Sequence, residues 1–229
     1  MMKHSKVHIT NQQHSKTYLL QISLVLVKCL VLNKILHYKK LRERENEGLL
    51  GEATREGIAI GAIKYSILKQ SPGKDIVFDF DTSLAVKGDS GPYLQYTYAR
   101  LRRIRKKSGW RRKLGVDLSK IGILGLPIFT GGRVDVSKLT HDQDIKVIKK
   151  LLDFPDTLQK STETLSPSIL ANYLYQLATE ANAYYETVKI LSDIKKSPER
   201  NARLLLVDIT ARTLKTGLHI LGIKTPERI

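Results

Sequence analysis

Two Ser-Pro pairs, Ser166-Pro167 and Ser197-Pro198, constrain the fold of this chain more than any other feature of its sequence. A serine side chain can accept a hydrogen bond from the free N–H groups at the start of a helix. Proline suits the next position, because the N–H of the first helical residue has no intrahelical partner. Each pair therefore predicts a helix start, and the long periodic segments that follow predict that both helices are long.

Both predicted helices carry an apolar stripe of the kind that packs in a helical bundle. At about 100° per residue, the apolar side chains after each Ser-Pro pair return to one face of the helix. The first helix should run to about Val188. The second should close at Gly222, because glycine readily adopts the left-handed conformation found there. The two stripes are Leu170, Leu174, Leu177, Ala181, Tyr184 and Val188, and Leu204, Val207, Ala211, Leu214, Leu218 and Leu221.

Shorter periodic segments precede this pair of helices. Apolar spacing indicates helices around residues 58–68, 92–107 and 142–154, and residues 76–81 alternate as in a short strand. Residues 110–138 are rich in glycine and predict a long loop. The sequence therefore predicts a mainly α protein with a helical-bundle domain. The apolar face of the third helix is predicted to contain Ile145, Ile148, Leu151 and Leu152.

A tyrosine-rich segment leads directly into a basic run. Residues 88–100 contain three tyrosines, and nine of the fourteen residues from 100 to 113 are lysine or arginine. Aromatic rings can stack on unpaired bases, and nearby cations neutralise phosphates. The chain has a net charge of +17, which favours encounter with polyanions. We interpret the segment as an RNA-binding surface, and a solvated basic face without a ligand is the alternative.

No motif in the sequence indicates a catalytic or metal site. Glycine-rich residues 122–132 match neither phosphate-loop nor dinucleotide-binding spacing, and the histidines and single cysteine lack zinc-ligand spacing. Asp79 and Asp81 could form an acid–base pair, but carboxylates that cap the following turn are the better interpretation. The cysteine usage fits a reducing, cytoplasmic setting.

Residues 1–50 differ in character from the rest of the chain. Residues 19–36 are apolar, but Lys28 and Lys34 interrupt them and the uninterrupted run is too short to span a membrane. No small-residue cleavage site follows, so a signal peptide is not supported. We expect an apolar helix that packs on another surface and no membrane association.

Five segments, taken in order, carry a resemblance to a known family. They are residues 59–65 (AIGAIKY), 75–79 (DIVFD), 88–100 (GDSGPYLQYTYAR), 170–175 (LANYLY) and 218–229 (LHILGIKTPERI). Together they resemble class I arginyl-tRNA synthetases across residues 51–229. The resemblance implies a divergent segment at 1–50 and a junction from the end of the catalytic region at 51–92. It also implies an α-helical anticodon-binding domain of the DALR type at 93–229.

Parts of that family's pattern are absent. Its catalytic domain carries a HIGH-type motif that helps to hold ATP, and this sequence has none. Residues 3–6 (KHSK) resemble its KMSK-type loop only weakly. The resemblance therefore implies that this chain has no catalytic residues and binds neither ATP nor arginine, which the complete enzyme uses. We expect the chain alone to be inactive in aminoacylation.

The resemblance implies that the partner is an arginine tRNA, tRNA(Arg), bound by its anticodon arm. Tyr185 and Ile229 occupy positions where the family reads the anticodon loop, and Tyr93, Gln95 and Tyr96 belong to a motif near the tRNA-facing junction. For each tyrosine, core packing is the alternative. The sequence itself adds Asn172, Tyr175 and Asn182 as candidates for base contacts, and Arg100, Arg102, Arg103, Lys106 and Lys107 as candidates for phosphate contacts.

Two other functions remain open from the sequence. The chain could be one subunit of a split ligase, docked through residues 19–36 on a separate catalytic polypeptide, which co-purification would reveal. It could instead be a non-catalytic module that binds RNA or protein. Shallow salt dependence and indifference to tRNA identity would favour a protein-binding module.

Overall fold

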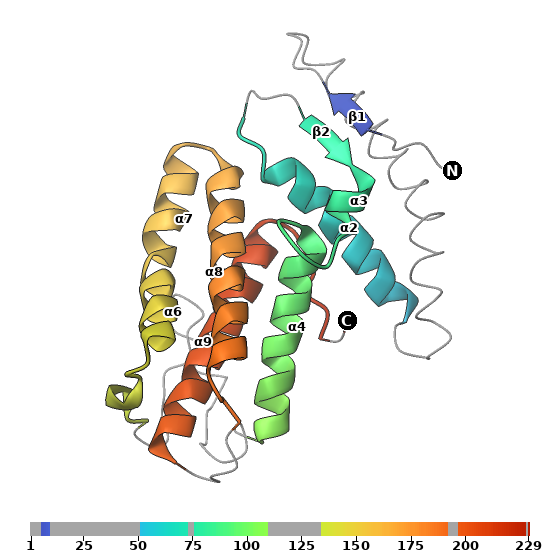
Figure 1. The fold of residues 1–229 in the computed structure, drawn as a ribbon. Coiled ribbons are helices and arrows are strands. Elements are labelled where there is room, and N and C mark those ends of the chain that lie inside the picture. Colours follow the sequence, from blue (N-terminus) through green and yellow to red (C-terminus); the bar gives the residue numbers. More distant parts are fainter. Residues whose placement is uncertain (1–5, 10–50, 73–75, 110–133, 192–196, 228) are drawn as a thin grey trace.

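The described part of the protein is mainly α-helical, as the sequence predicts (Figure 1). The structure is a computed structural model. The predictions for residues 10–50 and 110–133, which include the apolar segment and most of the glycine-rich loop, lie outside the described residues. The described residues are 6–9, 51–72, 76–109, 134–191, 197–227 and 229.

Helices dominate the order of elements along the chain. Strands β1 and β2 pair antiparallel, with Lys6 opposite Asp79 and Ile9 opposite Ile76. The elements are β1 (Lys6–Ile9), α2 (Glu52–Leu68), β2 (Ile76–Asp79), α3 (Phe80–Ser83), α4 (Gly91–Ser108), the 3-10 turn η1 (Val136–Lys138), α6 (Asp142–Leu152), α7 (Phe154–Glu163), α8 (Pro167–Thr187) and α9 (Pro198–Ile220).

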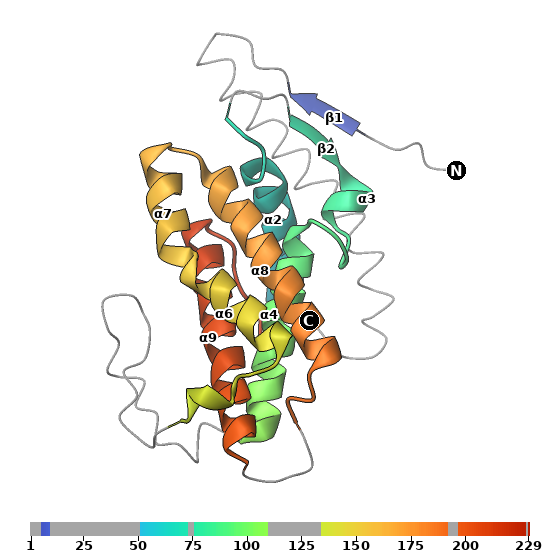
Figure 2. The ribbon, with the colours of Figure 1, turned by 60° about the vertical axis from the view of Figure 1, so that its left-hand side comes forward.

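The long helices α4, α8 and α9 pack side by side and form the centre of a bundle (Figure 1). Figure 2 shows α6 and α7 lying against α8, while α2 packs on α4. One apolar core runs through the bundle and includes Tyr65 of α2 as well as Leu218 of α9. The predicted junction helix therefore shares its core with the bundle.

The predicted helix ends are found at their places, with one difference in detail. The Ser197 hydroxyl accepts a hydrogen bond from the Arg200 N–H at 3.0 Å, as a capping serine does. Ser166 also precedes a helix, but its hydroxyl pairs with that of Ser168 at 3.0 Å instead of capping. At the end of α9, Gly222 has a φ of 67°. The N–H of the residue after it donates to the Leu218 carbonyl at 2.8 Å, which satisfies the helix end.

Both predicted stripes of α8 and α9 are buried, whereas the face predicted for residues 142–154 is only half right: Ile148 and Leu151 pack against the core, but the other two residues do not. Ile145 is 39% exposed and Leu152 is 72% exposed, while Val147 is only 1% exposed. The buried face instead includes Asp144, whose carboxylate accepts from the His141 N–H at 3.1 Å and closes a capping box. Because the polar residue Asp144 occupies a buried position of α6, the spacing of apolar residues alone does not identify the buried face of this helix.

A close backbone approach joins α2 to α4. A Cβ added at Gly91 would lie 2.5 Å from the Gly61 carbonyl oxygen, and one added at Gly61 would lie 2.6 Å from Gln95 Nε2. Real Cβ atoms do not approach other atoms so closely, and at Gly91 the neighbouring atoms are backbone, so glycine is required at that position for this packing. The contact fixes the start of α4 against α2.

We expect Gly91→Ala to destabilise the protein by about 1–3 kcal/mol, because the added methyl group must push two backbones apart. The unfolding midpoint in urea measures this change. Gly51→Ala is the matched control, since a Cβ there would meet nothing within 4 Å. Equal midpoints for the two variants would contradict the close approach.

Tyr65, Tyr173 and Tyr184 are three of the tyrosine side chains that are buried in the core, together with Tyr98. The Tyr65 hydroxyl lies 2.6 Å from Asp89 Oδ1 and 3.2 Å from the Ala171 carbonyl oxygen. Burial raises the pKa of Tyr65, Tyr173 and Tyr184 above the ordinary value of a phenol, and the Asp89 carboxylate raises that of Tyr65 further. The native fold therefore holds these hydroxyls neutral.

The stability that these phenols provide should be complete below the unfolded-state pKa of about 10 and should be lost as the pH rises above it. We expect Tyr65, Tyr173 and Tyr184 to ionise only when the protein unfolds in alkali. Ultraviolet difference spectroscopy of tyrosinate, followed together with helical circular dichroism, measures both events. Full tyrosine ionisation with helical structure intact would contradict this expectation.

Candidate nucleic-acid interface

Helices α4 and α8 bring a group of aromatic and polar side chains together on one side of the bundle. Its centre is Arg100, whose guanidinium carbon lies 4.9 Å from the ring centroid of Tyr96 and 5.0 Å from that of Tyr185. A cation between two aromatic faces is attracted to both rings. We call this group the α4–α8 cluster; it consists of Tyr93, Tyr96, Arg100, Tyr175, Asn182 and Tyr185.

Asn182 ties the two helices together within the cluster. Its Nδ2 donates to the Tyr93 hydroxyl at 3.0 Å and to Thr97 Oγ1 at 2.8 Å. Its Oδ1 accepts from an Arg100 N–H at 3.0 Å. The Tyr93 ring also lies 5.8 Å from that of Tyr175. Sequence reasoning missed Thr97, although it lies one turn after Tyr93 on the same helix.

The cluster offers ordered aromatic surface to a ligand. Tyr185 is 44% exposed and is held by Arg100, while Tyr93, Tyr96 and Tyr175 are half-buried. Rings whose orientation is fixed lose little entropy when a base stacks on them. The cluster therefore has the chemistry of a binding surface for unpaired bases.

The basic side chains of α4 lie on different sides of the helix and have different surroundings. At about 100° per residue, Arg103 and Lys107 lie on the same side of the helix as Arg100, and both are exposed. Arg102 points away from them and pairs with Glu227. Lys106 is exposed on that other side. Among the residues of α4, the exposed positive charge on the side of the cluster is therefore that of Arg103 and Lys107.

Arg105 has a structural role instead. Its side chain is only 6% exposed and pairs with Asp208 of α9. The other carboxylate oxygen of Asp208 accepts from Arg212 Nε at 2.8 Å. A buried carboxylate between two guanidinium groups is satisfied on both sides, so Arg105 belongs to the contact between α4 and α9.

The prediction that Gln95 contacts RNA is wrong for this structure. The side chain has no exposed surface. Its Nε2 donates to the Gly57 carbonyl at 3.1 Å and to the Lys224 carbonyl at 2.7 Å. Adjacent helical residues point about 100° apart, so Tyr96 can face outward while Gln95 faces α2 and the C-terminal tail.

Two other predicted residues lie away from the cluster. Asn172 is exposed on α8, where its Oδ1 accepts from Gln176 Nε2 at 3.4 Å. Ile229 is half-buried at the end of the tail that follows α9. Within the described part of the chain, neither residue makes a hydrogen bond or ring contact with the cluster.

The helical fold and the comparisons with known proteins identify the class of protein as an α-helical anticodon-binding domain. Residues 94–229 match the family model of the DALR anticodon binding domain, and the chain belongs to that family. Its relatives are arginyl-tRNA synthetases, to whose C-terminal part it corresponds, so the family predicted from the sequence is confirmed.

The similarity extends over most of this chain but only part of each relative. The arginine–tRNA ligase of Halothermothrix orenii is 38% identical over 201 residues, which are 87% of this chain and 32% of that protein. The Actinobacillus succinogenes ligase is 36% identical over 83% of this chain and 30% of its own length. This chain therefore spans about a third of the length of the curated relatives it matches.

Solved structures show the same fold. The arginyl-tRNA synthetase of Thermus thermophilus matches with a TM-score of 0.71 and 30% identity, over 88% of this chain and 32% of that one. The Plasmodium falciparum enzyme matches with a TM-score of 0.67 and 28% identity, over 89% of this chain and 33% of its own. Among the described residues, no helix combines the length and apolarity needed to cross a membrane.

We expect Asn182→Ala to destabilise the protein by about 1–2 kcal/mol, because three hydrogen-bonding groups on α4 lose their shared partner. Urea unfolding measures the change. Thr179→Ala is the control on the same helix, since Thr179 is exposed and should change stability by less than about 0.5 kcal/mol. An Asn182→Ala protein as stable as the control would show that the cluster does not join the helices.

Proposed function

We propose that this chain binds the anticodon arm of an arginine tRNA through the α4–α8 cluster. The observation that carries the proposal is Arg100 held between the Tyr96 and Tyr185 rings, with Arg103 and Lys107 exposed on the same side of α4. Membership of the DALR anticodon-binding family supports it, as do relatives named arginine–tRNA ligase.

The physical basis of binding is stacking together with charge neutralisation. Unpaired bases of the loop stack on the exposed face of Tyr185 and on the neighbouring rings of the cluster. Arg103 and Lys107 neutralise the phosphates beside those bases, which releases counterions. The net charge of +17 raises the rate of encounter with the tRNA.

Ligation of arginine is not proposed for this chain alone. In the complete family enzyme, ATP-dependent ligation uses a catalytic region with a HIGH-type motif, and this sequence has no such motif. The chain's part in that reaction is to hold the anticodon arm in the cytoplasm, while the ATP and arginine sites belong to a catalytic region. A separate polypeptide that supplies this region would make the chain a subunit of a split ligase.

Binding of the full chain to an arginine tRNA transcript tests the proposal. An anticodon-substituted transcript and an unrelated tRNA are compared at several salt concentrations. We expect a preference for the native anticodon, and we expect Tyr185→Ala to raise the Kd about 5- to 100-fold, the loss of one stacked base. Tyr185→Phe keeps the ring and should bind nearly as the wild type does.

The charged residues give a second readout in the same titrations. Arg103→Gln and Lys107→Gln should each lower the salt slope of log Kd by about one. Arg102→Gln removes the same charge on the side of α4 that pairs with Glu227, so its effect on the slope should be smaller. Equal binding of all three RNAs by the wild type would overturn the anticodon-specific function.

A further inference from the structure

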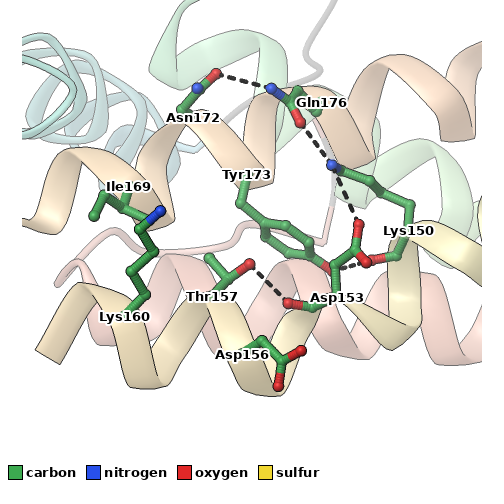
Figure 3. Close-up of a pocket in the computed structure, with 9 residues that line it drawn as sticks. All are labelled: Lys150, Asp153, Asp156, Thr157, Lys160, Ile169, Asn172, Tyr173 and Gln176. Atoms are coloured by element: carbon green, nitrogen blue, oxygen red, sulfur yellow. Dashed lines mark hydrogen bonds and ion pairs between the residues drawn. The ribbon is translucent and has the colours of Figure 1, made fainter. Parts of the chain in front are cut away.

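A second polar surface lies on the other side of α8, where it faces α6 and α7. There the side chains enclose an open groove of about 340 Å³ (Figure 3). At helical spacing, Tyr173 and Gln176 face this groove, whereas Tyr175 and Asn182 face α4. The exposed ridge of α8 that carries Asn172 therefore separates the α4–α8 cluster from this second surface, which we call the α7–α8 groove.

A chain of hydrogen bonds fixes the side-chain amides on the α8 wall of the groove. Lys150 Nζ donates to Gln176 Oε1 at 2.6 Å, and because an ammonium can only donate, the amide oxygen must face it. Gln176 Nε2 is then directed to Asn172 Oδ1, 3.4 Å away (Figure 3). The Asn172 Nδ2 has no acceptor among the described residues. This wall therefore presents N–H donors to a ligand.

The opposite wall and the base of the groove have different chemistry. Asp156 and Lys160 come from α7, and neither forms an ion pair within the described part of the chain. Figure 3 shows the Lys160 amine extending towards Ile169 of α8. Ile169 and the Tyr173 ring supply apolar surface, with Lys150 Nζ 5.4 Å from the ring centroid. The α7 wall thus offers a carboxylate acceptor and one cation.

We propose that the α7–α8 groove binds one unpaired nucleobase of the same RNA that the α4–α8 cluster holds. This inference rests on the proposed function. The charges of the two lysines in the groove, Lys150 and Lys160, are balanced by those of Asp153 and Asp156, so a neutral ligand is favoured over a free anion.

A base is the neutral ligand that this arrangement fits. Donors on the α8 wall match ring-nitrogen and carbonyl acceptors, and the Asp156 carboxylate matches an exocyclic amino group. The apolar atoms of Ile169 would lie against the heterocycle. The favoured bases are therefore those with an amino group beside an acceptor, which are adenine, cytosine and guanine. A loop that crosses the α8 ridge would reach both surfaces.

The test uses the full chain with an arginine tRNA transcript. Asn172→Ala should raise the Kd about 3- to 10-fold, the loss of one or two hydrogen bonds. Asn172→Asp should raise it further, because a carboxylate would face the acceptors of the base. Lys150→Ala frees the Gln176 amide to turn and should also weaken binding. Gln159→Ala is the matched control, since Gln159 is an exposed α7 amide outside the groove that pairs with Glu163 at 2.8 Å.

Chemical footprinting of the loop bases separates a groove contact from a general loss of structure. In the wild-type complex one loop base should be protected, and Asn172→Ala should expose that base while leaving the protection due to the α4–α8 cluster intact. Groove variants that bind and protect as Gln159→Ala does, alongside a weakened Tyr185→Ala, would overturn the groove proposal and leave the proposed function standing. Absence of tRNA binding by the wild type would overturn both.

Discussion

The buried pairing of Arg105 with Asp208 contributes, together with the apolar stripe of α4, to how this helix is rotated about its own axis. One cation of the basic run is drawn into the contact with α9, and Arg212 completes the neutralisation of the carboxylate. Removing one partner would leave an uncompensated buried charge, so this rotation is strongly held. Because helical side chains have fixed angular spacing, Tyr96 and Arg100 must then face α8, and the interface follows from an interaction inside the bundle.

The side chains of helix α8 lie in three different environments. Its apolar stripe enters the core, its α4 side carries Tyr175, Asn182 and Tyr185, and its α7 side carries Tyr173 and Gln176. The two polar sides meet the solvent along a single exposed ridge. A ligand that follows this ridge would contact rings on one side and amides on the other without requiring any movement of the helix. The rigidity of the central helix therefore sets the geometry of the whole surface.

The sequence predicts the bundle well because its signals are local. Ser197 and Gly222 mark helix ends through contacts with near neighbours, and the α8 and α9 stripes need only the helical period. What the sequence does not predict depends on contacts between residues that are far apart in the chain. Gln95 is buried because α2 and the tail approach it, and the sandwich of Arg100 joins residues on two different helices. The spacing of residues in a sequence does not show whether a basic side chain forms a buried ion pair or remains exposed. The different roles of neighbouring basic residues on α4 are therefore visible only in the structure.

The buried amide of Gln95 also joins parts of the chain that are far apart in sequence. Its single nitrogen meets the Gly57 carbonyl of α2 and the Lys224 carbonyl of the tail, and Lys64 of α2 holds the nearby Gly222 carbonyl at 2.6 Å. These contacts hold residues 222–224 of the tail against α2, the helix that leads into the bundle. Because these hydrogen bonds are direct, a displacement of α2 would also displace the tail that follows α9. The two segments are therefore expected to move together.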